Sequence, residues 1–435
     1  MVKKAFIRAN IPFVIHEEMT FGNEFIQSAT GHGWTKREIQ GDLLLKHINT
    51  SFANNFVCFS KKCDGLNLVV PMIDAKTSSV KALYSITVSE VQVYCFDTEI
   101  GICSLLISYD QDTDEDAIAN CCSLLHCSVP HSDKKQCKPI LQDEKETYLS
   151  CIADHFIGSL LGSAYTLFGT SNQTQLRRIN MFSAALCNQE AAADEGAVCN
   201  NLCYRLANSY DARDKSLAVS KQDLHHQHHY IRWSFSKRGC AVVANLTGNA
   251  ENDHFLQNRW FFSVSSNYFY IYLMVLHEKL AIYHYLNSIA EDPDMEHLKI
   301  NQKSLIDFNN KYIFSIVSDE PFIQSAYLQL KQAANADDTY AELQEQLKRM
   351  FDYAQFQAAE AAEKKNDRFN LISIILGIAG FISIALDTVN FFTGLGFSIG
   401  FQSRGNSIYT AALSLEALLL LLVPCCLFGR NKKRK

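Results

Sequence analysis

The sequence predicts an α+β cytoplasmic domain, followed by antiparallel helices, a long stalk helix and a two-helix transmembrane hairpin at the C-terminus. Three observations lead to this prediction. Early runs are rich in β-branched and aromatic residues, a later stretch has helical periodicity without a breaker, and two long apolar runs lie near the end. The expected divisions are 1–260 (α/β domain), 261–368 (helical region ending in the stalk), 369–429 (hairpin) and 430–435 (basic tail).

Composition and charge argue against several protein classes. The 435 residues carry a net charge of −6, which gives no sign of a nucleic-acid surface. The first 30 residues contain no long apolar run, so we expect no signal peptide and a largely cytoplasmic chain. The 15 cysteines are therefore expected to be thiols, and pairs such as Cys58/Cys63 are too loosely spaced for zinc knuckles.

The first 130 residues are expected to be mixed α/β. The runs "AFIRANIPFVIHE", "LNLVVPMID" and "ALYSITVSEVQVYCF" have the β-branched and aromatic content of strands. The segment "VQVYCFDTEIGICSLLISY" predicts two strands joined by the turn "DTEIG", with Gly101 supplying a positive φ.

An acidic run, "DQDTDEDAIAN", follows this hairpin. Its spaced acids Asp110, Asp112, Asp114 and Asp116 resemble a calcium loop, but the loop's glycine and distal glutamate are missing. The favoured interpretation is a helix start, where acids cap amides and oppose the helix dipole.

A histidine-rich segment allows two interpretations. If residues 225–229 form a helix, His225, His228 and His229 share a face and, with His226, provide ligands for a transition metal. The alternative is an exposed polar connector.

The second half of the chain is expected to contain two more strands followed by helices. "YIRWSFSKRGCAVVANL" predicts two more short strands. The apolar segment 267–291 contains His277, Glu278 and Lys279, which indicates a buried helix of a soluble domain rather than a membrane span. Pro321 is typical of a helix start.

A stalk helix is predicted from about residue 338 into the first apolar run. Apolar residues at alternating three- and four-residue steps form a seam that expects a packed partner, and no breaker separates this seam from Leu371. An amphipathic helix lying on its own domain is the alternative. The seam comprises Tyr340, Leu343, Leu347, Met350, Ala354 and Ala361, with Gln357 as its one polar member.

The hairpin prediction depends on two apolar runs, 371–393 and 408–428, whose only charges are Asp387 and Glu416. About 20 helical residues cross a bilayer core. Basic residues flank both outer ends, so both termini are expected in the cytoplasm and the protein in the inner or plasma membrane as a multi-pass protein. Two buried helices of a soluble core are the alternative.

This arrangement resembles the CorA family of divalent-cation channels. The segments "WSFSKRGCAVVANL" and "NDHFLQNRWFFSVSSNYFYIYLMVLHEKLAIYHYL" are similar to its bacterial CorA-like branch. The resemblance implies a homopentamer in the bilayer, a pore lined by the first spans, Mg²⁺ as the transported ion and no cofactor.

The family's Gly-Met-Asn signature is absent, and the corresponding place contains "DTVNFFTGLGFSIG". Oxygen ligands usually meet Mg²⁺ through its retained water, whereas the nearby Arg404 would oppose cation entry. The candidate pore and selectivity residues are Asp387, Asn390, Thr393, Gly394, Gly405 and Asn406.

Three functions remain open. The first is a CorA-like channel or transporter for Mg²⁺ or other cations, controlled by the cytoplasmic domain. The second function is that of an effector: the chain resembles CRISPR-associated CorA-like effectors of type III systems, whose pore is gated by a small nucleotide, adenylated S-adenosylmethionine. The third is a membrane-anchored scaffold. The sequence has no P-loop, Gly-x-Ser-x-Gly or His-Glu-x-x-His motif, so an enzyme is not expected.

Overall fold

The computed structural model describes residues 1–394 apart from short internal segments. Those segments are 17–20, 39–43, 74–79, 110–112, 131–137, 169–177, 189–196, 212–218, 220–222 and 290–294. The chain divides into two compact units, Met1–Leu347 and Lys348–Lys435.

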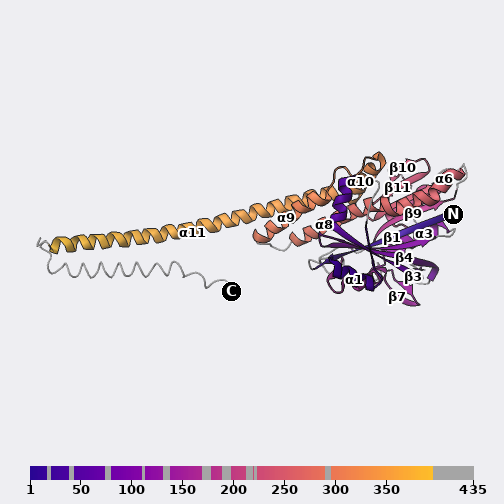
Figure 1. Ribbon diagram of the computed structural model, residues 1–435. Helices are drawn as coiled ribbons and strands as arrows, with labels where there is room; N and C mark the ends of the chain where they lie inside the picture. The colour runs from indigo at the N-terminus through magenta and orange to yellow at the C-terminus, as the bar shows by residue number, and fades with distance from the viewer. Residues whose placement is uncertain are drawn as a thin grey trace. The chain divides into compact units, whose positions relative to one another are not determined.

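The first unit is built on one 12-stranded sheet (Figure 1). Its strand order is β10-β11-β12-β9-β1-β5-β4-β3-β6-β7, with β2 paired to β3 and β8 paired to β1. The pairing is antiparallel except between β12 and β9. The strands are β1 (Val2–Ile15), β2 (Thr35–Arg37), β3 (Phe56–Ile73), β4 (Val80–Phe96), β5 (Ile100–Tyr109), β6 (Ile140–Gln142), β7 (Lys145–Thr147), β8 (Tyr165–Leu167), β9 (Asn180–Cys187), β10 (His225–His228), β11 (Ile231–Phe235) and β12 (Gly239–Asn245).

Helices cover the central strands on both faces, so β1 is buried along nearly its whole length. On one face, alternate residues of β1 such as Ile7 and Phe13 share a core with α1 (Asn23–Gly31), α3 (Glu115–His126), α4 (Leu149–Leu161) and α5 (Ala197–Asn208). On the other, Phe6 packs edge-on against Phe261, and Phe182 against Phe269.

A helical layer covers this second face. It begins with α6 (Ala250–Phe255), the π-helix η4 (Leu256–Trp260), α7 (Phe261–Ser263) and the π-helix η5 (Val264–Tyr268). It continues through α8 (Phe269–Ile289), α9 (Met295–Tyr312) and α10 (Pro321–Ala334). α2 (Lys46–Asn55) contacts β3 and α9. The last described helix, α11, spans Ala336–Gly394.

The predicted fold class is wrong in its C-terminal part. Among the described residues, one helix is long and apolar enough to cross a membrane, over Ala336–Ile384, and no second spanning helix is found. A two-helix hairpin is therefore not shown, and the apolar run 408–428 lies outside the described residues. The sheet also contains strands that the sequence did not predict, among them β9 and β10, while the predicted strands β11 and β12 extend it to residue 245.

The strands predicted in the first 130 residues are confirmed, but the reason given for Gly101 is wrong. In the β4–β5 turn it is Glu99 that takes a positive φ, of 64°. Gly101 lies in β5 opposite Phe13 of β1. A Cβ on Gly101 would meet the Phe13 ring at 2.0 Å. The glycine is needed for close approach of the ring, not for the turn.

Several helix predictions are confirmed. α8 is buried, with His277 and Glu278 at 0% and 1% exposure. α10 begins at Pro321. α3 begins with Glu115 and Asp116 in its first turn, where they oppose the helix dipole, although the N-cap residue Asp114 makes no side-chain cap hydrogen bond.

Candidate functional site

α11 is the candidate functional element. It is one uninterrupted helix of 59 residues, and at 1.5 Å per residue its length is about 88 Å. This confirms that the predicted stalk runs without a break into the first apolar run. No Pro occurs within it, and Asp337 and Asp338 in its first turn favour helix initiation.

The start of α11 packs within the first unit. Leu343 and Leu347, two members of the predicted seam, are 0% and 6% exposed. The alternative of a helix lying on its own domain is thus correct for this part. From residue 355 to residue 371 every side chain is exposed, so the remaining seam residues in that stretch lack cover in a single chain.

The far end of α11 is apolar and exposed. Its best 18-residue window has a mean hydropathy of 1.6 and is only 11% buried. Phe381 and Ile384 are 74% and 68% exposed. Contiguous apolar surface of this kind is unfavourable in water and marks a membrane or protein contact. Length and composition identify this helix as a candidate membrane span.

The two faces of this apolar segment differ. With a rotation of about 100° per residue, four exposed small or polar residues fall on one face, on which the exposed Ile384 also lies. Ile372 and Ala379, 8% and 4% exposed, lie roughly 100° around the helix from that face. A polar or small face within a membrane helix normally points to other helices or to a water-filled path. The small and polar members of this face are Ser373, Gly377, Gly380 and Asp387.

Only part of the predicted pore set is described. Asp387 is an exposed residue of α11. Asn390 and Gly394 follow it at helical spacing, whereas Thr393 is on another side of the helix, and the side chains of these three residues lie outside the description. Gly405 and Asn406 lie entirely outside it.

The base of α11 is held by a charge cluster that the sequence analysis missed. Nζ of Lys331 on α10 is 3.0 Å from Oε1 of Glu278 on α8 and 2.8 Å from Oδ1 of Asp337 on α11. Burial raises the pKa of Glu278 to about 7, and the ammonium of Lys331 only partly offsets this. Burial alone would lower the pKa of Lys331, but the two carboxylates raise it, so this group stays charged. The one sequence signal was a glutamate inside an apolar helix.

The same helix α8 is fastened to the sheet through the β4–β5 turn. Thr98 Oγ1 is 2.7 Å from Nε2 of His277, and Glu99 lies 3.5 Å from His284. Asp97 pairs with Lys311 of α9 at 2.6 Å. Burial lowers the pKa of His277 to about 3, so its ring is neutral and stacks on Phe96. The β4–β5 turn therefore connects the sheet to α8 and α9 through polar contacts.

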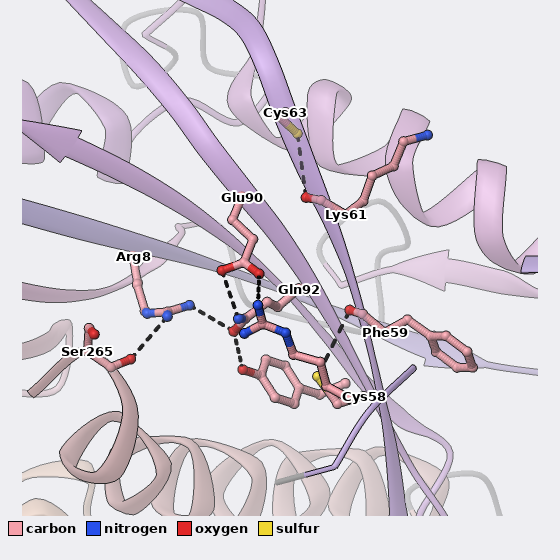
Figure 2. A network of polar contacts seen from close by, with 10 residues as sticks. Arg8, Cys58, Phe59, Lys61, Cys63, Glu90, Gln92 and Ser265 are labelled. Atoms are coloured by element: carbon pink, nitrogen blue, oxygen red, sulfur yellow. Dashed lines mark hydrogen bonds and ion pairs between the residues drawn. The ribbon is translucent and has the colours of Figure 1, made fainter. Parts of the chain in front are cut away.

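A polar network also lies under the helical layer, between the sheet and η5 (Figure 2). Nη1 of Arg8 donates to Oε1 of Gln92 at 2.9 Å, and Nη2 donates to the carbonyl of Ser265 at 3.0 Å. The Arg8 guanidinium stacks over Phe269 at 4.4 Å. Gln92 in turn donates to Glu90 at 3.1 Å. These contacts fix η5 and the start of α8 on β1 and β4.

The four histidines do not form the predicted helix. β10 contains His225, His226 and His228, and His229 follows in a turn. Side chains alternate between faces along a strand, so the shared helical face does not exist. His228 instead stacks on Tyr230 at 5.4 Å. Within the described parts of the chain, no group of three or more His, Cys, Asp or Glu residues could hold a metal ion.

Comparison of the chain with family models, curated proteins and solved structures found no match.

Proposed function

We propose that this protein is a homo-oligomeric, CorA-like membrane channel or transporter for cations, controlled by its large globular unit. The observation that carries the proposal is α11, because one unbroken helix joins residues packed in the first unit to an exposed apolar segment. A helix of this kind can carry a change at its base into the bilayer without a flexible joint.

The faces of the apolar segment support an oligomer. Lipid tails satisfy exposed large side chains such as Ile378 and Phe381, but they offer nothing to Asp387. A carboxylate at this depth is stabilised when it faces water or another polar group. In a ring of copies, Ser373, Gly377, Gly380 and Asp387 would line the axis, and the repeated carboxylate would attract cations.

The location follows from the charge flanking the apolar segment. Lys364, Lys365 and Arg368 lie immediately before it and are exposed. Basic residues favour the cytoplasmic side of a span. This supports a cytoplasmic location for Met1–Leu347 and an inner or plasma membrane location for the protein.

The test combines stoichiometry and flux in the full chain. Native mass spectrometry from detergent should show a closed oligomer, with five copies expected from the CorA resemblance. In proteoliposomes, Asp387→Asn should reduce cation flux several-fold, because it removes one charge per subunit from the path. Asp367→Asn, an exposed acid before the apolar segment, is the matched control and should conduct as the parent chain does.

Two results would overturn the proposal. A monomeric chain in detergent has no axis for a pore. An oligomer that carries no cation under any gradient would instead indicate a membrane-anchored scaffold. Equal flux in Asp387→Asn and Asp367→Asn would remove Asp387 from the path.

A further inference from the structure

The charge cluster at the base of α11 joins three helices through one buried ammonium. Lys331 is 6% exposed and contacts carboxylates on two different elements, Glu278 of α8 and Asp337 of α11. α10 and α11 are separated by one residue, Asn335, which takes a left-handed conformation. The pair between Lys331 and Asp337 is one of the contacts that hold the start of α11, and the hydrogen bond from Tyr340 to Oδ1 of Asn309 on α9 is another.

The two carboxylates differ in their access to water. Glu278 is 2% exposed and Asp337 is 70% exposed. Asp337 can exchange its contact with the ammonium for hydration, whereas Glu278 has no such alternative. Any weakening of the cluster should therefore appear first at Asp337, which means at the start of α11.

The charges in the cluster do not balance when both carboxyl groups are ionised. Two negative charges then share one ammonium, and each carboxylate opposes the other, as shown by the contribution of Asp337 to the raised pKa of Glu278. The other titratable groups near Glu278 on the helices packed against it are Tyr327 of α10 and Tyr340 of α11, whose raised pKa values keep them neutral.

Two other elements packed against α8, the β4–β5 turn and α9, contact His277, the residue before Glu278. Thr98 of the β4–β5 turn bonds to its ring, and Tyr312 of α9 lies 4.4 Å away, ring centre to ring centre. The His277 ring is neutral and buried, so it adds no charge to the cluster. The net charge of the Glu278–Lys331–Asp337 cluster is thus set by whether Glu278 is protonated.

We propose that the Glu278–Lys331–Asp337 cluster is a proton-dependent latch that sets how firmly the first turn of α11 is held on α8 and α10. With Glu278 protonated, Lys331 pairs with Asp337 alone and the turn is held. With Glu278 ionised, Asp337 is repelled and moves toward water, which loosens the turn. The pKa of Glu278, about 7, places this change near neutral pH. The inference concerns Met1–Leu347 and stands whether or not α11 conducts ions.

Hydrogen–deuterium exchange of the full chain in detergent tests the latch. Protection factors of the amides between residues 337 and 345 are compared at pH 6 and pH 8, after correction for the intrinsic exchange rate. We expect protection to fall about fivefold at pH 8, the size of one charge interaction across about 4 Å in water, since the Asp337 side chain is 70% exposed. Amides in β1 and β5 serve as an internal reference and should not change.

Three variants separate the latch from other effects of pH. Glu278→Gln should keep the high protection of the parent chain at both pH values. Asp337→Asn, at an exposed position, should show low protection at both. Glu342→Gln on the exposed side of α11 is the matched control and should respond to pH as the parent does.

Each of two outcomes would overturn the latch. One is a parent chain whose α11 protection is the same at pH 6 and pH 8. The other is a Glu278→Gln variant that keeps the full pH response. Since no ion flux is measured, failure of the latch is distinguishable from failure of the channel.

Discussion

The exposed apolar segment of α11 should insert into a bilayer, and a single lysine should prevent it. Six large apolar side chains there are between 47% and 74% exposed: Leu371, Ile374, Leu376, Ile378, Phe381 and Ile384. At about −0.3 to −0.6 kcal/mol each in membrane insertion, they favour the bilayer by about 2 to 3.5 kcal/mol. Ile378→Lys replaces a favourable term with an opposing one of about 3 kcal/mol, and the total change of about 3.5 kcal/mol is at least as large as that preference. The expected loss is a factor of several hundred in the insertion equilibrium.

The measurement is the fraction of α11 inserted into microsomal membranes, read by glycosylation of sites placed on either side of residues 355–394 in a host protein. The parent segment should be mostly inserted and the Ile378→Lys segment mostly not. Ala358→Lys, in the exposed polar stretch of the same helix, should insert as the parent does. Equal insertion of the Ile378→Lys and parent segments, or no insertion of the parent, would refute the assignment of α11 as a membrane span.

Two further predictions concern the first unit. Folding raises the pKa of Glu278 from 4.5 to about 7. The protonated form of Glu278 therefore contributes its full stabilisation to the folded chain below pH 4.5. This contribution to the unfolding free energy, about 3 kcal/mol in all, is lost as the pH rises through 7. Glu278→Gln should therefore match the parent's unfolding free energy at low pH and exceed it above pH 7 in denaturant titrations followed by fluorescence. In this variant Lys331 keeps Asp337 as its partner. If Glu278→Gln is instead less stable than the parent at pH 8, the buried Glu278–Lys331 ion pair stabilises the fold and the reasoning is wrong. Gly101→Ala should cost about 1 to 3 kcal/mol, since its Cβ would overlap the Phe13 ring. Adding Phe13→Leu to the Gly101→Ala chain should recover part of that lost stability. If the stability losses of the two single variants simply add in the double variant, a clash between the new Cβ and the Phe13 ring is not the cause.

Local pattern was sufficient for most elements of the first unit. β-branched runs predicted β1, β3, β4, β11 and β12, because strands buried in a sheet need those side chains. Interrupting charges correctly marked α8 as a buried helix. The strand order was not predictable, because β1 pairs with both β5 and β9, and such long-range pairings leave no trace in a local window.

The candidate site was predicted unevenly for similar reasons. The continuity of α11 follows from helical periodicity and the absence of proline, both visible in the sequence. The Glu278–Lys331–Asp337 cluster brings together residues from three helices, so only the folded chain reveals it. The helix that was one of two interpretations of the histidines is wrong, since a few neighbouring polar residues carry no period, and pairing with β11 decided the outcome.

The central position of β1 also bears on synthesis of the chain. Its partners β5 and β9 end at residues 109 and 187, and β12, which closes on β9, ends at Asn245. The first strand to leave the ribosome therefore waits until residue 187 of 435, more than two fifths of the polypeptide, before its neighbours are complete. During that interval its unpaired edges are exposed to aggregation. A chaperone or slow elongation would protect the nascent protein until that point, well before the apolar part of α11 reaches the membrane machinery.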